Sequence, residues 1–210
     1  AIWGGGIELD TFRVPFRIVG CRFVGNGADR GDAGVGCGGG IFINGPNLDI
    51  IVGTPTVADS NYFERNYAED GGAIAVYNGS SPIIQNNNFQ SNKADRNGDG
   101  YGMGGGILTH EAGTNPWIGG NAVLNEDNTF AYNVAGTPLA IRQGRGGAMA
   151  FRRTSSPIVQ GNHLYFNGAT YAGAGIADSS HAVDTTIIGG VNDGEIILSM
   201  DVPVPLAILA

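Results

Sequence analysis

The chain has 210 residues, of which 37 are glycine and only 14% are charged, and its formal net charge at pH 7 is −8. So low a charged fraction is unusual for a cytoplasmic globular domain. An acidic surface also argues against nucleic acid and anionic membranes as partners. The most distinctive feature of the sequence is internal repetition. Repeats are considered before local motifs because they determine the architecture of the fold.

The first repeated element is Gly-Gly-(Gly/Ala)-Ile. Paired glycines permit a tight bend where neighbouring backbones approach closely, and the residues after them alternate between two faces of a strand. The element occupies residues 4–7, 38–41, 71–74 and 104–107, with imperfect copies at 146–149 and 173–176. We expect two inward columns, one of Ile7, Ile41, Ile74, Ile107, Met149 and Ile176, and one of Leu9, Ile43, Val76, Thr109 and Phe151.

Two further elements follow each glycine element along the chain. A proline with an apolar run comes first, at residues 14–16, 81–84, 115–118 and 156–159. Phe-x-x-Asn comes next, at residues 23–26, 63–66, 89–92 and 130–133, with Leu164 and Asn167 as a degenerate fifth copy. Another asparagine recurs two residues before the Phe, at Asn61, Asn87, Asn128 and Asn162, and Cys21 replaces it in the first copy. Stacked copies of this asparagine predict a ladder of amide hydrogen bonds.

Three short strands per repeat, joined by loops of variable length, are typical of a parallel β-solenoid. The sequence therefore predicts an all-β parallel β-helix of about five full rungs and a degenerate sixth, over residues 1–190. Residues 191–210 are predicted to be a C-terminal capping or partner-binding strand segment. The apolar run 202–210 is too short to span a bilayer, so we expect no transmembrane segment.

The alternation of GGA(I/L/V) and FxxN resembles the repeats of the polymorphic outer-membrane proteins of bacterial surfaces, over about residues 4–180. The resemblance implies a right-handed parallel β-helix located outside the cell or on its surface, often as a passenger or adhesin. The first glycine element starts within three residues of Ala1, so we expect a mature or processed product. Cys21 and Cys37 flank the first long loop, and a disulfide and two small buried thiols are equal alternatives.

A candidate calcium site lies in the loop after the third Phe-x-x-Asn element. Residues 95–100 match the D-x-N-x-D-G start of a calcium loop, with Asp95, Asn97 and Asp99 as ligands. The acidic residue expected at the twelfth position is missing, because Gly106 stands there. A metal-free Asn/Asp/Gly turn is the alternative.

A candidate ligand surface lies on the outward side of the strand after each glycine element. Alternation predicts an outward column of Glu8, Phe42, Ala75, Leu108, Ala150 and Ala177, and a second of Asp10, Asn44, Tyr77, His110, Arg152 and Ser179. Tyr77, His110, Arg152 and the adjacent Arg153 are the predicted ligand-binding residues of a shallow polysaccharide cleft. His110, Glu111 and Arg152 are the candidate catalytic residues of a lyase. The alternative is a solvated strand face without a ligand.

Two functions from different classes follow from these patterns. The first is an extracellular or cell-surface structural solenoid that assembles end to end or acts as an adhesin-like module. The second is a protein that binds or degrades a polysaccharide. The acids and bases of the chain do not cluster at a recognisable spacing, whereas no amphipathic helix covers either end of the predicted solenoid. The sequence therefore favours the structural function and demands no enzyme.

Overall fold

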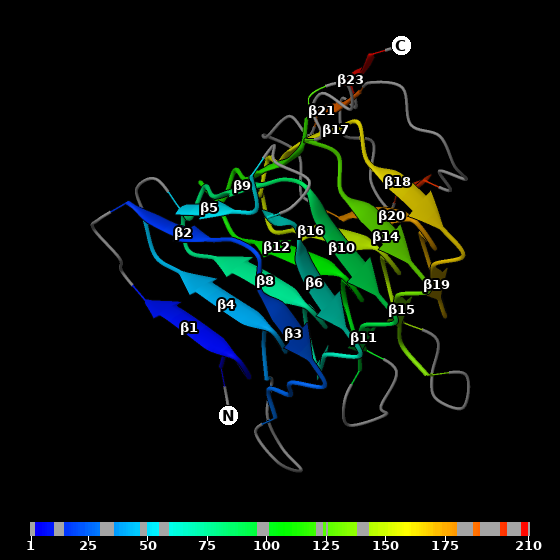
Figure 1. Ribbon diagram of the computed structural model, residues 1–210. Helices are drawn as coiled ribbons and strands as arrows, with labels where there is room; N and C mark the ends of the chain where they lie inside the picture. Colours follow the sequence, from blue (N-terminus) through cyan, green and yellow to red (C-terminus); the bar gives the residue numbers. More distant parts are fainter. Residues whose placement is uncertain are drawn as a thin grey trace.

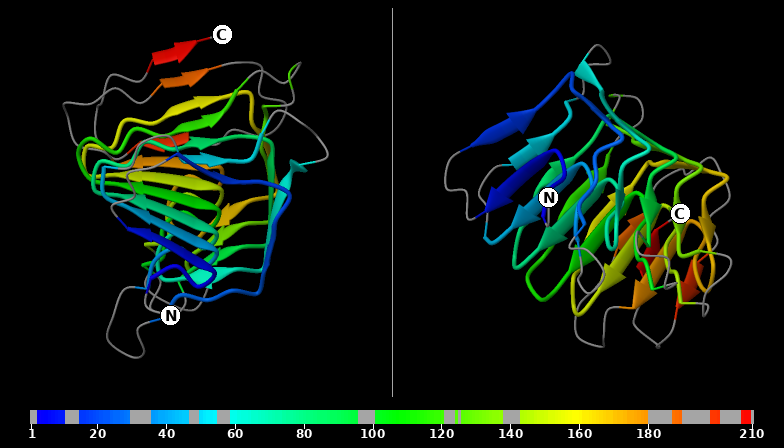
Figure 2. Two further views of the ribbon diagram at one scale, coloured as in Figure 1. Left: turned by 60° about the vertical axis from the view of Figure 1, so that its left-hand side comes forward. Right: turned by 90° about the horizontal axis from the view of Figure 1, so that it is seen from below.

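The computed structural model describes residues 3–10, 15–29, 36–46, 50–54, 59–95, 101–120, 124, 126–137, 143–179, 187–189, 198–200 and 207–209. Within these ranges there is no α-helix, and every pair of strands is parallel. The strands form four sheets that wrap around one axis, and successive rungs stack along it (Figures 1 and 2). This arrangement confirms the predicted all-β parallel β-helix.

Each sheet collects the strand that follows one kind of repeated element. Sheet 1 contains β1 (Ile7–Asp10), β4 (Ile41–Asn44), β8 (Ile74–Tyr77), β12 (Ile107–His110), β16 (Met149–Arg152), β20 (Ile176–Ser179) and β22 (Leu198–Met200). Sheet 2 contains β2 (Phe16–Ile18), β5 (Ile50–Val52), β9 (Ile83–Ile84), β13 (Trp117–Gly119), β17 (Ile158–Gln160), β21 (Ile187–Gly189) and β23 (Ala207–Leu209). Sheet 3 contains β3 (Arg22–Val24), β6 (Asn61–Glu64), β10 (Asn87–Gln90), β14 (Thr129–Ala131) and β18 (His163–Tyr165).

Sheet 4 was not predicted, because the sequence indicated only three strands per rung. It contains β7 (Tyr67–Ala68), β11 (Lys93–Ala94), β15 (Val134–Ala135) and β19 (Gly168–Ala169). Its strands have two residues each, too few for alternation to be recognised in the sequence. Beyond the fifth rung, β20 and β21 continue sheets 1 and 2, and β22 and β23 of the 191–210 segment pair with them in parallel.

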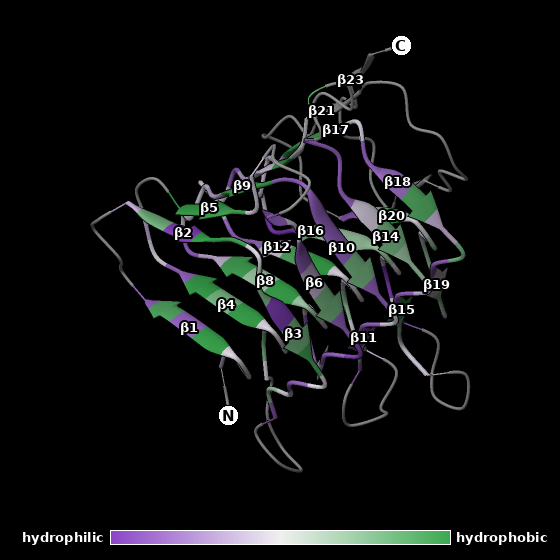
Figure 3. Cartoon of the chain, in the orientation of Figure 1, coloured by the Kyte–Doolittle hydropathy of each residue, from purple (hydrophilic) through white to green (hydrophobic). Residues whose placement is uncertain are grey.

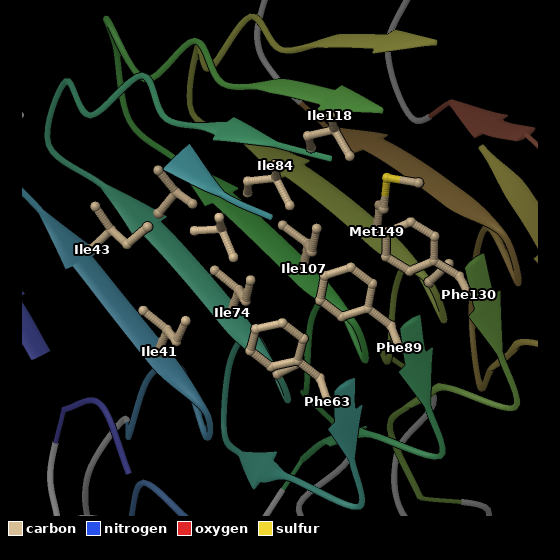
Figure 4. Packing of buried hydrophobic residues seen from close by; sticks show 14 of the residues in the cluster. Ile41, Ile43, Phe63, Ile74, Ile84, Phe89, Ile107, Ile118, Phe130 and Met149 are labelled. Atoms are coloured by element: carbon tan, nitrogen blue, oxygen red, sulfur yellow. The ribbon is translucent and has the colours of Figure 1, made fainter. Parts of the chain in front are cut away.

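The register of sheet 1 confirms the two predicted inward columns. Ile74 lies opposite Ile41 on one side and Ile107 on the other, and both columns continue in the same way along the sheet. Ile41, Ile74 and Ile107 are fully buried, and they form a row beside the phenylalanines in Figure 4. Strands β4, β8 and β12 are accordingly mainly hydrophobic in Figure 3. Among the predicted members of the second column Thr109 is the polar one, and its Oγ1 lies 2.8 Å from the hydroxyl oxygen of Ser155.

The phenylalanines of sheet 3 form a continuous stack through the core. The ring centroids of Phe23 and Phe63, and those of Phe63 and Phe89, are 4.8 Å apart, and those of Phe89 and Phe130 are 4.5 Å apart. The rings lie within 10° of parallel, and Leu164 occupies the next position along the stack. This spacing is the distance between parallel strands, roughly 4.8 Å, so the stack follows directly from in-register pairing.

The paired glycines have two different roles, which Gly71 and Gly72 illustrate. Gly71 has a φ of +65°, a left-handed conformation that a residue with a Cβ adopts only with strain. Gly72 lies against the next rung, where a Cβ would come within 2.3 Å of the carbonyl oxygen of Gly105. The first glycine therefore makes the bend, and the second allows the stacked backbones to approach.

Buried asparagines form two ladders, one on each side of the phenylalanine stack. The predicted ladder runs from the backbone N–H of Cys21, which donates to Asn61 Oδ1, to Asn162. The second ladder, which was not predicted, consists of the asparagines that end each Phe-x-x-Asn element: Asn26, Asn66, Asn92, Asn133 and Asn167. In both, the Nδ2 of each asparagine between the ends of the ladder donates to the Oδ1 of the next rung and to a backbone carbonyl of the preceding rung. These side chains therefore satisfy the backbone at bends that water does not reach.

We predict that Phe89→Ala lowers the free energy of unfolding by about 3 to 5 kcal/mol, because it opens a cavity in a close-packed stack. Denaturant unfolding followed by circular dichroism measures this loss. Gln90→Ala, at the adjacent exposed position of β10, is the control and should change stability by less than about 0.5 kcal/mol. A loss below about 1 kcal/mol for Phe89→Ala would contradict the register.

We predict a loss of at least about 3 kcal/mol for Asn92→Ala. The substitution leaves the backbone N–H and Nδ2 of Asn66 and the carbonyl of Phe63 without their partner, and each buried unsatisfied group costs about 1 to 3 kcal/mol. Asn88→Ala is the matched control, because Asn88 belongs to neither ladder and lies on the side of strand β10 opposite to Asn87 and Phe89. Equal losses in the two variants would show that the ladder contributes nothing.

Candidate functional site

The structure brings Tyr77, His110 and Arg152 together in the predicted order. They occupy equivalent positions at the ends of β8, β12 and β16, one rung apart. The rings of Tyr77 and His110 are stacked, with centroids 4.7 Å apart and an angle of 23° between their planes. Glu111 and Arg153 follow at the bend after these strands, both with left-handed backbone (φ 80° and 45°).

From Phe42 to Ala177, the first of the two predicted outward columns is covered and not solvated. Phe42, Ala75, Leu108, Ala150 and Ala177 point away from the core, yet at most 5% of each is exposed. A second layer covers them, formed by the residues that precede each glycine element and bridge in parallel from rung to rung: Trp3, Cys37, Asp70, Met103, Arg145 and Ala172.

The bend at the first glycine of each element explains this covering. At Gly71 an added Cβ would lie 2.8 Å from Ala75 Cβ, so the chain turns directly onto the outer side of sheet 1. Cys37 then packs with Phe42 and Ala75, while Met103 packs with Leu108 and Ala150. Strand alternation alone cannot predict such a layer, because it depends on the left-handed bend before the strand.

The covered position changes the chemistry of Cys37 and Tyr77. Burial, with the neighbouring Asp70 carboxylate as a second cause, raises the pKa of the Cys37 thiol to about 12. The same two causes raise the pKa of Tyr77 well above its usual value. The Cys37 Sγ and the Tyr77 hydroxyl lie 3.4 Å apart and form a hydrogen bond. Cys37 is therefore protonated at neutral pH, whereas a nucleophilic cysteine has to be a thiolate.

His110 is also held in its neutral form. Only 6% of the residue is exposed, and burial, followed by the charges of Arg152 and Arg153, lowers its pKa to about 4. Its Nδ1 lies 3.5 Å from Glu111 Oε1 but has no hydrogen-bond partner among the described residues. Glu111 and Arg153 are more open, with 37% and 65% of their side chains exposed and a closest N···O distance of 3.9 Å. The site thus has a neutral, covered imidazole beside an exposed ion pair.

Only one of the three predicted calcium ligands lies in the described part of the chain. Asp95 is fully buried and has a φ of 86°, whereas Asn97 and Asp99 lie outside the described residues. Among the described residues no three His, Cys, Asp or Glu side chains are grouped to hold a metal ion. The calcium site stays a prediction.

Both cysteines are free thiols in the structure. Cys21 is partly buried, and its Sγ donates a hydrogen bond to the Val19 carbonyl at 3.2 Å, while Cys37 lies in the layer over sheet 1. Across the described ranges, no helix has the length and apolar character that crossing a membrane requires.

A different surface collects polar and aromatic residues that the sequence patterns did not single out. The residue before the asparagine of each Phe-x-x-Asn element has left-handed backbone and lies at an exposed bend after sheet 3. We call these residues, Gly25, Arg65, Ser91, Tyr132 and Phe166, the bend column. Beside it lies a hollow of about 300 Å³, lined by Arg65, Asn66, Tyr67, Ser91 and Lys93. The sequence feature that could have identified these residues is the variable third position of Phe-x-x-Asn. In-register stacking places the side chains at this position one rung apart.

No protein-family model, curated protein or solved structure matches this chain. The resemblance to outer-membrane protein repeats therefore rests on the motifs themselves.

We predict that His110 makes the protein less stable as the pH falls from about 6.5 to about 4. The unfolded chain, with a histidine pKa near 6.5, binds the proton in this window, whereas folded His110 has a pKa of about 4. The expected loss from this residue is roughly 2 to 3 kcal/mol. His110→Phe, which keeps a ring against Tyr77, should remove this part of the pH dependence. Unfolding measured at pH 7 and pH 4 for both proteins tests it, and identical pH profiles would contradict it.

Proposed function

We propose that the chain is a structural solenoid module of an extracellular or cell-surface protein, which joins end to end with further copies. The observation that supports this proposal is the in-register repetition of every interior column. The apolar columns, the phenylalanine stack and both asparagine ladders contact their own equivalents in the next rung. A structure whose rungs contact only their neighbours extends without changing its core.

We propose that such joining involves the first described rung, which lies at one end of three sheets. Strands β1, β2 and β3 each pair with a described strand on one side only. The Cys21 carbonyl accepts a hydrogen bond from Tyr62, and Gly25 N–H donates to Glu64. Because these directions alternate along a strand, the backbone groups of Arg22 and Val24 point away from β6. Val24 is 47% exposed, so this edge combines main-chain groups with apolar surface. An edge of this kind is a template for another strand.

The ladders favour one orientation of the joined copies. Asn66 Nδ2 donates to Asn92 Oδ1, and Asn92 Nδ2 donates to Asn133 Oδ1, so each ladder has a donor end and an acceptor end. Head-to-tail joining matches donors to acceptors, whereas head-to-head joining sets like groups against each other. Head-to-tail contact is heterologous and forms filaments unless the rotation closes a ring.

We predict that the protein forms oligomers or filaments that grow with concentration, and that Val24→Pro reduces them. Proline removes the outward N–H of β3 and leaves the hydrogen bonds to β6 in place. Light scattering and negative-stain electron microscopy across a concentration series measure the assembly. Val24→Thr keeps the N–H and is the matched control. Circular dichroism verifies that both variants fold. A wild-type protein that stays monomeric at high concentration, or a Val24→Pro variant that assembles equally well, would refute the proposal.

A further inference from the structure

We propose that the bend column and the adjoining hollow bind an acidic polysaccharide, a chain of sugars carrying carboxylate or sulfate groups. This site differs from the sheet 1 surface, where His110 and the strand positions beside it are covered. It does not depend on the structural function proposed above.

The hollow has the composition of an anion site. Arg65 and Ser91 occupy successive positions of the bend column, and Tyr67 and Lys93 are paired residues of β7 and β11 in sheet 4. Two cationic residues, Arg65 and Lys93, and two hydroxyl-bearing residues, Tyr67 and Ser91, therefore line the hollow of about 300 Å³. Such groups give charge-assisted hydrogen bonds to carboxylate and sulfate oxygens.

The local charge is opposite to that of the whole chain. The net charge of the protein is −8 and Lys93 is its only lysine, yet Lys93 lies close to Arg65 at this hollow. The Glu64 carboxylate forms ion pairs with two nearby cations. Its oxygens lie 3.0 Å from Arg65 and 3.7 Å from Arg22. Lys93 has no ion pair with any described residue. Arg65 and Lys93 are the charged residues among those that line the hollow, and both are cations, which attract an anionic ligand.

Two exposed aromatic rings continue the same column. Tyr132 and Phe166 follow Ser91 in the next two rungs, with 52% and 76% of each residue exposed. Their rings are stacked with centroids 5.2 Å apart, and their φ angles are 57° and 51°. Bulky residues in left-handed backbone are strained, and such strain concentrates at functional positions. In the first rung Gly25 fills this position. The exposed parts of the rings offer apolar surface that can pack against the apolar face of a sugar ring.

The spacing of these groups indicates an extended polymer. Each rung contributes one contact along the axis at intervals of roughly 4.8 Å, first the cations and then the aromatic rings. A sugar polymer that carries charged groups and has apolar ring faces can contact both kinds of group along the axis. Nucleic acid carries a denser row of phosphates, which the overall negative charge of the protein repels. We therefore assign the site to an acidic polysaccharide.

Binding is tested by isothermal titration calorimetry with polygalacturonate, chondroitin sulfate, neutral dextran and oligothymidylate DNA. We expect wild-type protein to bind at least one of the two acidic polysaccharides, and the tighter of them shows whether carboxylate or sulfate is preferred. Lys93→Gln and Arg65→Asn should each weaken that binding at least about tenfold, as expected for a lost charge-assisted hydrogen bond. Asparagine at position 65 tolerates the left-handed backbone.

Matched controls separate this site from a general effect of charge. Arg17→Gln removes an exposed cation from β2 in sheet 2 and should leave binding unchanged. Tyr132→Asn should weaken binding without changing its dependence on salt, because it removes a ring and no charge. Thermal unfolding of each variant establishes that it is folded. The assignment is overturned if neither acidic polysaccharide binds, if dextran or the oligonucleotide binds more tightly, or if folded Lys93→Gln and Arg65→Asn bind as the wild type does.

Discussion

In-register parallel pairing is the constraint on which the rest of the structure depends. It places each residue directly above its own equivalent, so a residue type that is costly when buried alone becomes stable when it is repeated. Asn92 illustrates this, since both of its neighbours in the ladder are asparagines and its amide donates and accepts along the axis. A lone buried amide would have to find partners of other kinds. The same constraint stacks Phe63 on Phe89 with nearly parallel rings.

The constraint also explains which features the sequence could predict. Residues facing the core recur at the same motif position, so the columns of Ile74 and Phe89 and the ladder of Asn87 were predictable. The two-residue strands of sheet 4 were not, because Lys93 and Ala94 are too few to show a period. The ladder through Asn92 was missed although its motif was recognised, since nothing in a single motif says that two amides per rung are buried. The covering of Leu108 by Met103 depends on a left-handed bend at Gly104, which alternation does not describe.

The residue type varies from rung to rung mainly at the exposed bends. The core positions around Phe89 accept few residue types, whereas the bend column holds glycine, arginine, serine, tyrosine and phenylalanine in successive rungs. A repetitive interior therefore supports a surface that differs from rung to rung. The candidate site at Arg65 and Lys93 uses this freedom, while Tyr77 and His110 lie where the second layer limits access.

The pairing of each ladder residue with the next has a consequence for how such a chain changes length. Asn61 and Asn87 are 26 positions apart, as are Asn66 and Asn92, so both ladders advance together from one rung to the next. Loss or duplication of one complete rung would rejoin both ladders, the phenylalanine stack and all four sheets. Loss of a few residues within a strand would instead misalign every column at once. The length of the solenoid is therefore expected to change by whole rungs. Duplication of the gene segment that encodes one rung is the simplest way to lengthen it.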